Sequence, residues 1–201
     1  CIQYGSTPKD LHEADPKRFD DCFNSAKALS MRAPEVLGKH YEISYPGRQW
    51  NSARHLKKLP LQKKFSESKA QLGQFFGWER PLYFNSLRDP VLTFNKPEWH
   101  EQVGKEVEQA NNKAAIFDQS SFGKLEVKGK DACKFLNRVC ANQMDRSPGK
   151  VIYTSMLNNK GGIESDFTAI RIKDDYFRLY VGTTSVKKDI SWLKKNLNDN
   201  D

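Results

Sequence analysis

The sequence predicts an α+β fold, and three observations carry this prediction. Segments with alternating polar and apolar residues follow one another between residues 151 and 181. Glycine-containing turns separate these segments, as hairpin connections require. Segments with an apolar stripe at helical spacing precede and follow them. We therefore expect a mostly antiparallel sheet with packed helices, preceded by a small helix-rich linker module.

The first expected helix covers residues 16–31. Asp15 is a good N-cap, Pro16 suits the first helical position, and Phe19, Phe23 and Leu29 recur at helical spacing. Pro34 should end this helix or kink it, because proline restricts the residue before it.

A connecting module is expected after this helix. Pro46 and Gly47 mark a turn, and the alternation of Tyr41, Ile43 and Tyr45 resembles a short strand. The aromatic-rich segment 77–84 shows neither a helical nor a strand period, so we expect a structural joint. The joint should cover residues 54–84, with Trp78 and Phe84 buried and Arg80 paired with a carboxylate or with backbone carbonyls.

A second helix is expected to open at Pro97, with an apolar stripe of Trp99, Val103, Val107 and Ala110. Residues 115–117 and 125–127 are then expected as short strands around a turn at 120–123. The next helix carries a stripe from Ala132 to Cys140.

Three strands and a final helix complete the expected order. The strands cover residues 151–156, 163–172 and 176–181, and residues 158–162 form the hairpin loop between the first two. Ser185 or Thr184 can cap the last helix, whose apolar positions are Val186, Ile190, Leu193 and Leu197.

The strand 163–172 carries the candidate functional residues. Alternation places Ile163, Ser165, Phe167 and Ala169 on one face, which we expect to be the core face. The other face carries Glu164, Asp166, Thr168 and Ile170 beside Tyr153 of the neighbouring strand. This mixture suits either a half-apolar ligand site or a partly solvated outer face.

Composition excludes several classes of protein. Of the 201 residues 37% are apolar, and no run approaches the ~20 apolar residues of a membrane span. The four cysteines form no C-x-x-C pair and no evident disulfide framework, which predicts reduced thiols in a reducing compartment. The four histidines have no partner at metal-ligand spacing, so we expect no metal site.

The net charge of +8 would favour polyanionic partners if it were concentrated on one face. It is instead spread along the chain, and the densest stretch, residues 48–64, is most simply a solvated face. No nucleic-acid-binding motif accompanies it, so nucleic acid is not an expected partner, although a basic nucleic-acid binder is one rival interpretation. The glycines at 161–162 and the segment 147–150 lack the spacing of nucleotide-binding loops.

Several motifs in the second half resemble the folate-binding aminomethyltransferase domain of the glycine-cleavage T-protein. They are Tyr-Thr-Ser-Met-Leu-Asn at 153–158 and Gly-Gly-Ile-Glu-Ser-Asp-Phe-Thr at 161–168, together with segments 116–118, 121–124 and 135–142. Upstream, residues 54–60 and 77–81 resemble the central linker module of flavin-dependent dimethylglycine and sarcosine dehydrogenases. Residues 4–11 and 15–19 resemble the tail of their FAD-binding domain.

This resemblance implies three parts. Residues 1–30 would be the tail of the flavin domain, residues 31–90 the linker module, and residues 91–201 an incomplete folate-binding domain. The chain opens at Cys1 without a signal segment, so we expect an internal piece of a longer protein.

The resemblance also implies a function. Such enzymes oxidise an N-methyl group of a small amino acid on FAD, and tetrahydrofolate captures the one-carbon unit as 5,10-methylenetetrahydrofolate. The resemblance places the key carboxylate on Asp166 and a folate-contacting aromatic ring on Tyr153. It also places pocket walls on Phe122, Thr168 and Ile170. T-proteins usually have a second Asp where this chain has Ser165, and a large apolar residue where it has Thr168.

Cofactors, partners and compartment follow from the same resemblance. Tetrahydrofolate would bind here and FAD outside the chain, with an N-methylated glycine derivative as substrate. The compartment would be the bacterial cytoplasm or the mitochondrial matrix. The alternatives are a non-catalytic regulatory relative, like the regulatory subunit of pyruvate dehydrogenase phosphatase, and a stand-alone aminomethyltransferase-like folate-binding protein.

Overall fold

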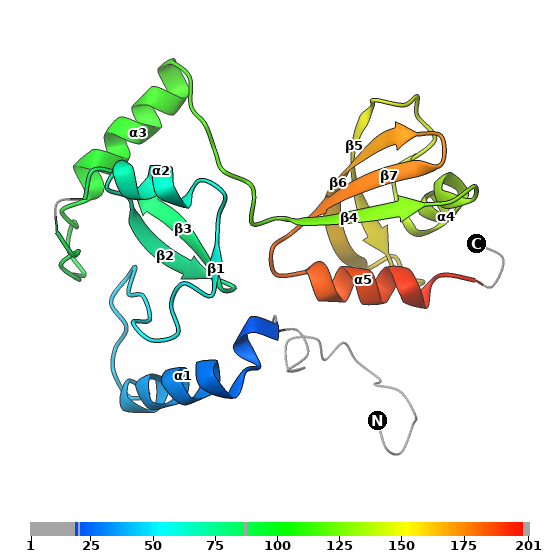
Figure 1. The fold of residues 1–201 in the computed structure, drawn as a ribbon. Helices are drawn as coiled ribbons and strands as arrows, with labels where there is room; N and C mark the ends of the chain where they lie inside the picture. Colours follow the sequence, from blue (N-terminus) through cyan, green and yellow to red (C-terminus); the bar gives the residue numbers. More distant parts are fainter. Residues whose placement is uncertain (1–18, 20, 87, 199–201) are drawn as a thin grey trace. The chain divides into compact units, whose positions relative to one another are not determined.

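The computed structural model describes residues 19, 21–86 and 88–198. They divide into two compact units, one from residue 19 to 121 and one from residue 122 onward, and each is described by itself. Both contain helices and a sheet, which is mixed in the first unit and antiparallel in the second, and this confirms the α+β class (Figure 1). No helix among the described residues is long and apolar enough to cross a membrane.

The first unit opens with a short 3-10 helix, η3 (Asp21–Phe23), and the helix α1 (Ala26–Gly38). The expected helix over 16–31 is therefore wrong in its bounds, although residues 1–18 lie outside the described part. The helix begins at Ala26 because the Oγ of Ser25 caps it, accepting a 3.1 Å hydrogen bond from the Ala28 N–H.

Pro34 lies inside α1 and does not end it. Residues outside the helix bind the helical turn after Pro34, because Glu35 accepts hydrogen bonds of 2.8 Å from the backbone N–H groups of Asn51 and Ser52. Burial acts to raise the pKa of Glu35, but these bonds and Lys39 hold that pKa well below its usual range. Tertiary bonds therefore extend the helix past the proline.

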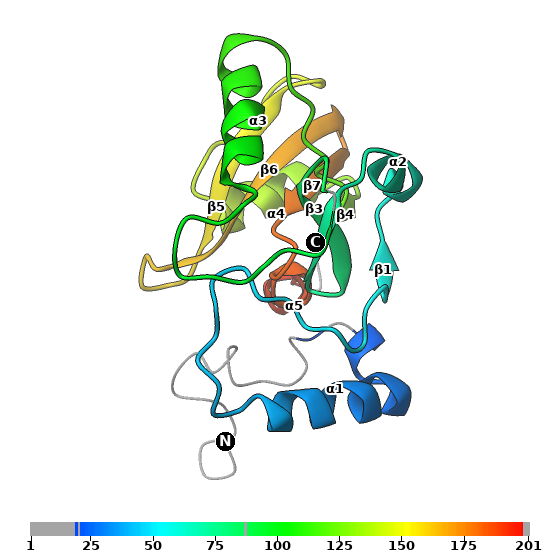
Figure 2. The same ribbon diagram turned by 90° about the vertical axis from the view of Figure 1, so that its left-hand side faces the viewer.

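A three-stranded sheet follows, in the order β1-β3-β2. It contains β1 (Lys57–Lys58), β2 (Gln71–Phe75) and β3 (Trp78–Tyr83), with the short helix α2 (Gln62–Glu67) between β1 and β2 (Figures 1 and 2). The antiparallel β2 and β3 are joined by a two-residue turn in which Phe76 and Gly77 have positive φ (48° and 82°). The expectation of a non-periodic segment at 77–84 was therefore wrong.

Glu79, and not Trp78, is the buried anchor of this sheet. Glu79 is fully buried and forms an ion pair with Arg54, while Trp78 is half-buried beneath the ammonium group of Lys57. Arg80, expected to pair with an oxygen, lies over the ring of Phe75 instead. Phe84 is likewise half-buried.

The expected second helix is present as α3 (His100–Asn112), but it starts three residues after Pro97, the predicted first residue, and buries none of its residues. Two expected strands do not form. Tyr41 and Ile43 (96% and 80% exposed) lie in a loop after α1, and Ile116 and Phe117 (94% and 71% exposed) lie in a segment without regular secondary structure or strand partners. Alternation without a neighbouring strand to pair with does not make a strand. The turn at Pro46–Gly47 is present, with positive φ at Gly47.

The second unit is a four-stranded antiparallel sheet in the order β4-β7-β6-β5. Its strands are β4 (Gly123–Lys128), β5 (Val151–Leu157), β6 (Ile163–Lys173) and β7 (Tyr176–Val181), and its helices are α4 (Ala132–Val139) and α5 (Val186–Lys195). These elements confirm the order expected from residue 125 onward. The side chain of Asn158 holds the hairpin loop by accepting from the N–H groups of Lys160 and Gly162.

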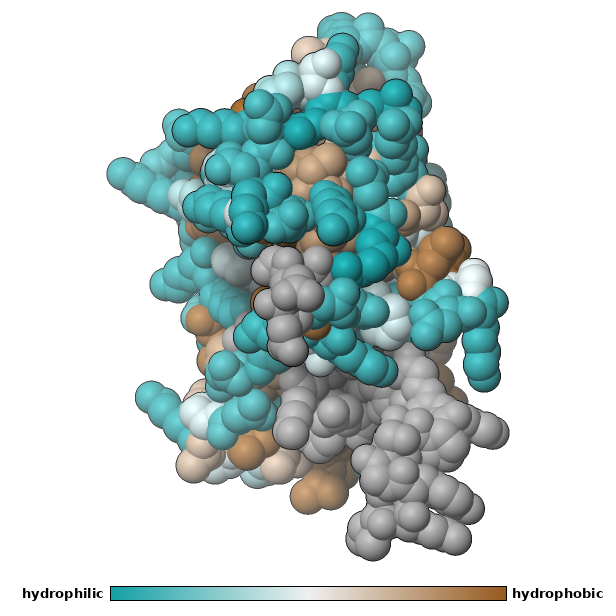
Figure 3. Space-filling model, turned by 90° about the vertical axis from the view of Figure 1, so that its right-hand side faces the viewer, coloured by the Kyte–Doolittle hydropathy of each residue, from teal (hydrophilic) through white to brown (hydrophobic). Residues whose placement is uncertain are grey.

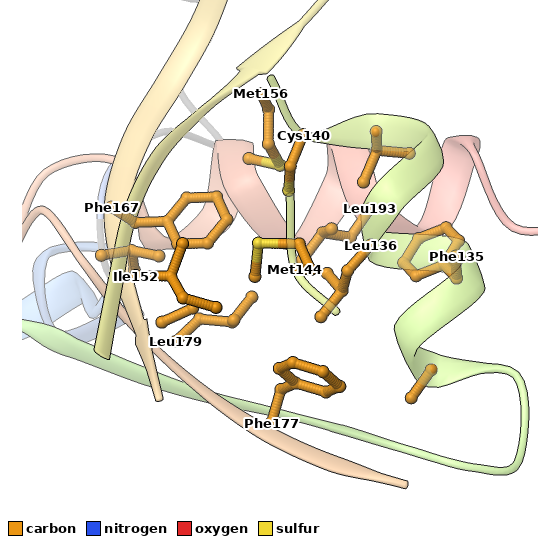
Figure 4. Close-up of a cluster of buried hydrophobic side chains, with 14 residues drawn as sticks. Phe135, Leu136, Cys140, Met144, Ile152, Met156, Phe167, Phe177, Leu179 and Leu193 are labelled. Carbon is orange, nitrogen blue, oxygen red and sulfur yellow. The ribbon is translucent and has the colours of Figure 1, made fainter. Parts of the chain in front are cut away.

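The core of this unit lies on one face of the sheet. The stripe of α4 and Leu193 of α5 pack on buried residues of β5, β6 and β7, with Met144 between them (Figure 4). Leu136, Met156, Phe177 and Leu179 have no exposed surface. Cys140 packs in this core as a small apolar group, and burial raises its pKa to about 12.

The side of the molecule drawn in Figure 3 is mainly hydrophilic, with apolar residues scattered between the polar ones. This agrees with a mean hydropathy of −0.77. The exposed apolar side chains of the second unit include Tyr153 and Val151, which lie on β5.

Candidate functional site

The outward face of β6 carries the predicted site residues. Asp166, Thr168 and Ile170 alternate with Phe167 and Ala169, which are 2% and 0% exposed in the core. The predicted assignment of these positions to two faces is therefore confirmed. Ile163, expected on the core face, is 70% exposed because it pairs with Leu157 beyond an irregularity in the register.

Tyr153 and Asp166 are joined by a hydrogen bond. Ser155 is the direct partner of Asp166 and Thr168 that of Tyr153, so the two residues are diagonal neighbours on adjacent strands. The Tyr153 hydroxyl donates to Oδ2 of Asp166 over 2.6 Å. This bond and the charge of the carboxylate raise the pKa of Tyr153. The phenol is therefore a hydrogen-bond donor that fixes a carboxylate.

The strand that presents Tyr153 is held on its outer edge. The Ala141 N–H donates to the Ser155 carbonyl (2.8 Å), and the side chain of Asn142 donates to the Tyr153 carbonyl (3.0 Å). The Asn142 N–H donates to Oγ1 of Thr154, which is buried. The segment after α4 thus satisfies edge groups of β5 next to the tyrosine.

Thr168 and Ile170 occupy successive rows of the same face. Thr168 lies between Tyr153 on β5 and Tyr180 on β7, and Ile170 lies between Val151 and Arg178. Both are half-buried. The sheet therefore brings Asp166, Tyr153 and Thr168 together, with Ile170 one row further along.

Phe122 stands apart from this group. It precedes β4, which is separated from β6 by β7, so two strand spacings of about 4.8 Å lie between β4 and β6. Its side chain is 37% exposed. The structure gives no contact between Phe122 and Asp166, and a shared pocket wall stays a prediction.

Sequence reasoning missed Tyr180 and Arg178 on β7. Both belong to the outward set of a strand whose other positions, Phe177, Leu179 and Val181, are fully buried. The strict alternation of β7 was the signal that could have found them. Arg178 contacts the hydroxyls of Tyr176 and Tyr180 and the carboxylate of Glu126, which raise its pKa.

Around Asp166 this face therefore offers a fixed carboxylate among phenol rings, a hydroxyl and apolar side chains, and a second carboxylate, Glu126, is paired with Lys128, Tyr176 and Arg178 on the outward side of β4 and β7. Such a set can bind a flat ligand with polar edges and can stabilise a positive charge that develops near Asp166. Within the ranges that the structure describes, no three His, Cys, Asp or Glu side chains lie close enough together to hold a metal ion.

Two protein families match the chain. Residues 61–201 match the family described as "GCVT N-terminal domain", and residues 4–58 match "FAD dependent oxidoreductase central domain". The first family match ends at residue 58 and the second begins at residue 61, whereas the two compact units of the structure divide at residue 121. The predicted boundaries at 30 and 90 stay predictions.

Among curated relatives, the chain is 29% identical to 4-methylaminobutanoate oxidase (formaldehyde-forming) of Paenarthrobacter nicotinovorans, over 95% of this chain and 24% of that protein. It is 30% identical to the mitochondrial pyruvate dehydrogenase phosphatase regulatory subunit of Mus musculus, over 96% of this chain and 23% of that protein. Mitochondrial dimethylglycine dehydrogenase of Rattus norvegicus is 27% identical, with coverage of 96% and 23%. The chain spans about a quarter of the length of these relatives.

A solved structure agrees with this assignment. The glycine cleavage system aminomethyltransferase T from Bartonella henselae is 25% identical, with a TM-score of 0.55, over 70% of this chain and 35% of that one. The family match covers more than half of the chain and includes every predicted site residue. The chain belongs to the GCVT N-terminal domain family, and its relatives include dimethylglycine and sarcosine dehydrogenases.

Proposed function

We propose that this chain is the folate-binding part of a longer, flavin-dependent dehydrogenase of N-methylated amino acids. In that enzyme it captures the one-carbon unit on tetrahydrofolate as 5,10-methylenetetrahydrofolate. The observation that supports the proposal most is the hydrogen bond between Tyr153 and Asp166, on the outward face of the sheet, in a chain of the GCVT family.

The residues on this face fit folate chemically. A pterin ring system has flat faces that stack on aromatic side chains and polar edges that need hydrogen-bond partners. Tyr153 and Tyr180 flank Thr168, and Val151 and Ile170 add apolar surface in the next row. Tyr153 and Val151 are both 64% exposed and so accessible to a ligand.

Asp166 would act in the capture step. A folate amine that attacks an electrophilic carbon gains positive charge, and a fixed carboxylate stabilises that charge. Two N–H bonds become N–C bonds, and with formaldehyde the two protons leave with its oxygen as water, so the carboxylate can take a proton from the amine and pass it to that oxygen. Tyr153 would hold the carboxylate in position, because its hydroxyl already donates to Oδ2.

The remaining parts of the reaction lie outside this chain in our proposal. FAD and the site of amine oxidation belong to the preceding part of the polypeptide, consistent with the match of residues 4–58 to a central domain of FAD-dependent oxidoreductases. The substrate is an N-methylated glycine derivative. The compartment is the mitochondrial matrix or the bacterial cytoplasm, since several relatives are named as mitochondrial and one is bacterial.

A second candidate is a non-catalytic regulatory protein. One relative of about the same identity is named as a phosphatase regulatory subunit. The Asp166 carboxylate, exposed and bonded to the accessible Tyr153, supports the enzyme, because one-carbon capture can use an anion at this position.

The test uses the full-length polypeptide with dimethylglycine and with sarcosine, each with and without tetrahydrofolate. We expect flavin reduction by one of these amines, and methylenetetrahydrofolate in place of free formaldehyde when tetrahydrofolate is present. Absence of amine oxidation would support the regulatory candidate. Formaldehyde release that is unaffected by tetrahydrofolate would contradict the capture function.

A further inference from the structure

A buried acid lies behind the candidate site. Asp189 is in the first turn of α5 and has no exposed surface. It lies three residues after Val186 and four before Leu193, on the same side of the helix as these apolar residues, and none of the roles proposed above uses it. The other fully buried carboxylate of the described chain, Glu79, is paired with an arginine.

Asp189 has serines, and not a cation, as hydrogen-bonding neighbours. Its Oδ2 lies 2.7 Å from the Oγ of Ser185, and the hydroxyl of Ser165 on β6 is a second neighbour, which acts to lower the pKa of the carboxyl group. Its Oδ1 has no hydrogen-bond partner in the part of the chain that the structure describes. An ionised carboxylate in this position would leave a charged oxygen buried without a donor.

The number of protons available at Ser185 also indicates that Asp189 is protonated. The Oγ of Ser185 lies 3.2 Å from the Gly182 carbonyl and 2.7 Å from Asp189 Oδ2, but a hydroxyl carries one hydrogen. A carbonyl only accepts. Both contacts are satisfied when Asp189 carries a proton and donates to Ser185, which then donates to Gly182.

The surrounding charges agree with a neutral acid. Burial raises the pKa of Asp189, and the negative charge of Asp166 adds to this, while the two serines and Lys188 act in the opposite direction. Lys188 lies 3.7 Å from a carboxylate oxygen of Glu164 on β6, so part of its charge is offset there.

Two consecutive residues of α5, Lys188 and Asp189, therefore contact two consecutive residues of β6, Glu164 and Ser165. Lys188 reaches Glu164 and Asp189 reaches Ser165, and the next residue of the strand is Asp166. Close packing also fixes this end of the helix, since Val186 lies against Gly123 at the start of β4.

We propose that Asp189 is a neutral carboxylic acid that positions Asp166 by fastening the first turn of α5 to Ser165. Its effect on one-carbon capture rests on the function proposed above, whereas its protonation does not. The two parts are therefore tested separately.

Infrared spectroscopy tests the protonation. The carbonyl stretch of a protonated acid is separated from the bands of carboxylates, and we expect it in the wild-type chain at pH 7. Asp189→Asn should remove it, and the matched control Asp175→Asn, at an exposed position, should not. A wild-type spectrum that loses no such band on Asp189→Asn would overturn the assignment.

The pH dependence of stability gives a second readout. An acid that stays protonated when folded binds more protons than the unfolded chain above about pH 4, so it lowers stability as the pH rises. The difference in the free energy of unfolding between Asp189→Asn and wild type should therefore grow in favour of the variant from about pH 4 to pH 8. Asp175→Asn should show no such trend, and a constant difference for Asp189→Asn would count against a protonated acid.

Product analysis of the full-length enzyme tests the positioning role. Asp189→Asn keeps a neutral side chain of the same size and should retain capture, whereas Ser165→Ala and Asp189→Ala should each lower methylenetetrahydrofolate formation about tenfold. Amine oxidation should stay unchanged in all three. If Asp189→Asn loses as much capture as Asp189→Ala, the neutral acid is not what positions Asp166. If the wild type forms no methylenetetrahydrofolate, the proposed function fails while the infrared result still stands.

Discussion

Tyr153 on β5 donates a 2.6 Å hydrogen bond to Asp166 on β6, which lies two residues from the direct partner of Tyr153. Diagonal neighbours on a sheet face are separated by about 7–8 Å between backbones, a span that a tyrosine side chain can bridge. The carboxylate is thereby held in one place although its residue is exposed. A fixed anion is what electrostatic stabilisation of a developing cation requires.

Removing the phenol hydroxyl should weaken capture without unfolding the protein. Tyr153→Phe deletes one hydrogen bond to a charged group, so methylenetetrahydrofolate formation should fall about tenfold, while the free energy of unfolding should change by less than about 0.5 kcal/mol. The matched control is Tyr176→Phe, which removes a phenol bonded to Glu126 on the same sheet. Equal loss of capture in both variants would contradict a specific role for Tyr153.

Glu79 should dominate the stability of the first unit. Burial acts to raise its pKa, but the hydrogen bonds from Arg54 and from the His55 N–H outweigh this effect and lower it. Glu79→Gln breaks a buried pair and should destabilise the unit by about 3 kcal/mol. Glu42→Gln, which removes the 56%-exposed partner of Arg48, should cost less than about 1 kcal/mol.

Urea unfolding followed by tryptophan fluorescence measures this difference. Trp50, Trp78 and Trp99 lie in the first unit, so the signal reports mainly on it. A Glu79→Gln variant as stable as Glu42→Gln would show that the buried pair contributes nothing beyond a surface pair.

Gly123 should tolerate no side chain. A Cβ there would lie 2.5 Å from Cγ2 of Val186 and 2.6 Å from Cγ2 of Val181, well inside contact distance. Gly123→Ala should lower the free energy of unfolding by about 2 kcal/mol, as overpacking does. Gly104→Ala meets nothing within 4 Å and lies inside α3, so it should stabilise by about 0.5–1 kcal/mol. Thermal unfolding of the two variants should thus shift in opposite directions.

Glu126 should contribute a stability that disappears in acid. Lys128 and Tyr176 are its main hydrogen-bond donors and lower its pKa to about 2. Because its folded pKa lies below the unfolded value, its contribution is present above about pH 4.5 and is lost as the pH falls toward 2. Glu126→Gln should therefore lower stability at pH 7 but not at pH 2. Equal effects of the substitution at both pH values would contradict this account.

The second unit was largely predictable because its sequence pattern and its packing agree. The alternation of Phe167 and Ala169 with Asp166 and Thr168 is produced by the same one-sided core that α4 and α5 cover. The site residues on β6 followed directly from this alternation. The diagonal register that brings Tyr153 next to Asp166 could not be predicted in this way, because the sequence of one strand does not determine its register with the next.

The first unit was less predictable because long-range polar contacts shape it. Glu35 accepts hydrogen bonds from the backbone of residues 51 and 52, and these bonds stabilise the part of α1 that follows Pro34. The local sequence around Pro34 does not predict these bonds. The turn at Phe76 and Gly77 places a bulky aromatic residue at positive φ, against its own preference. Asp189 escaped notice for a related reason, because a carboxylate in a helix is ordinarily exposed.

The product ratio of Asp166→Asn in the full-length enzyme tests the central claim most directly. The substitution keeps the size of the side chain and removes its charge, so amine oxidation should be unchanged and folate binding only modestly weaker. Loss of electrostatic stabilisation should lower methylenetetrahydrofolate formation about 100-fold or more, with a matching rise in free formaldehyde. If the ratio of methylenetetrahydrofolate to formaldehyde equals that of the wild type, Asp166 has no part in capture.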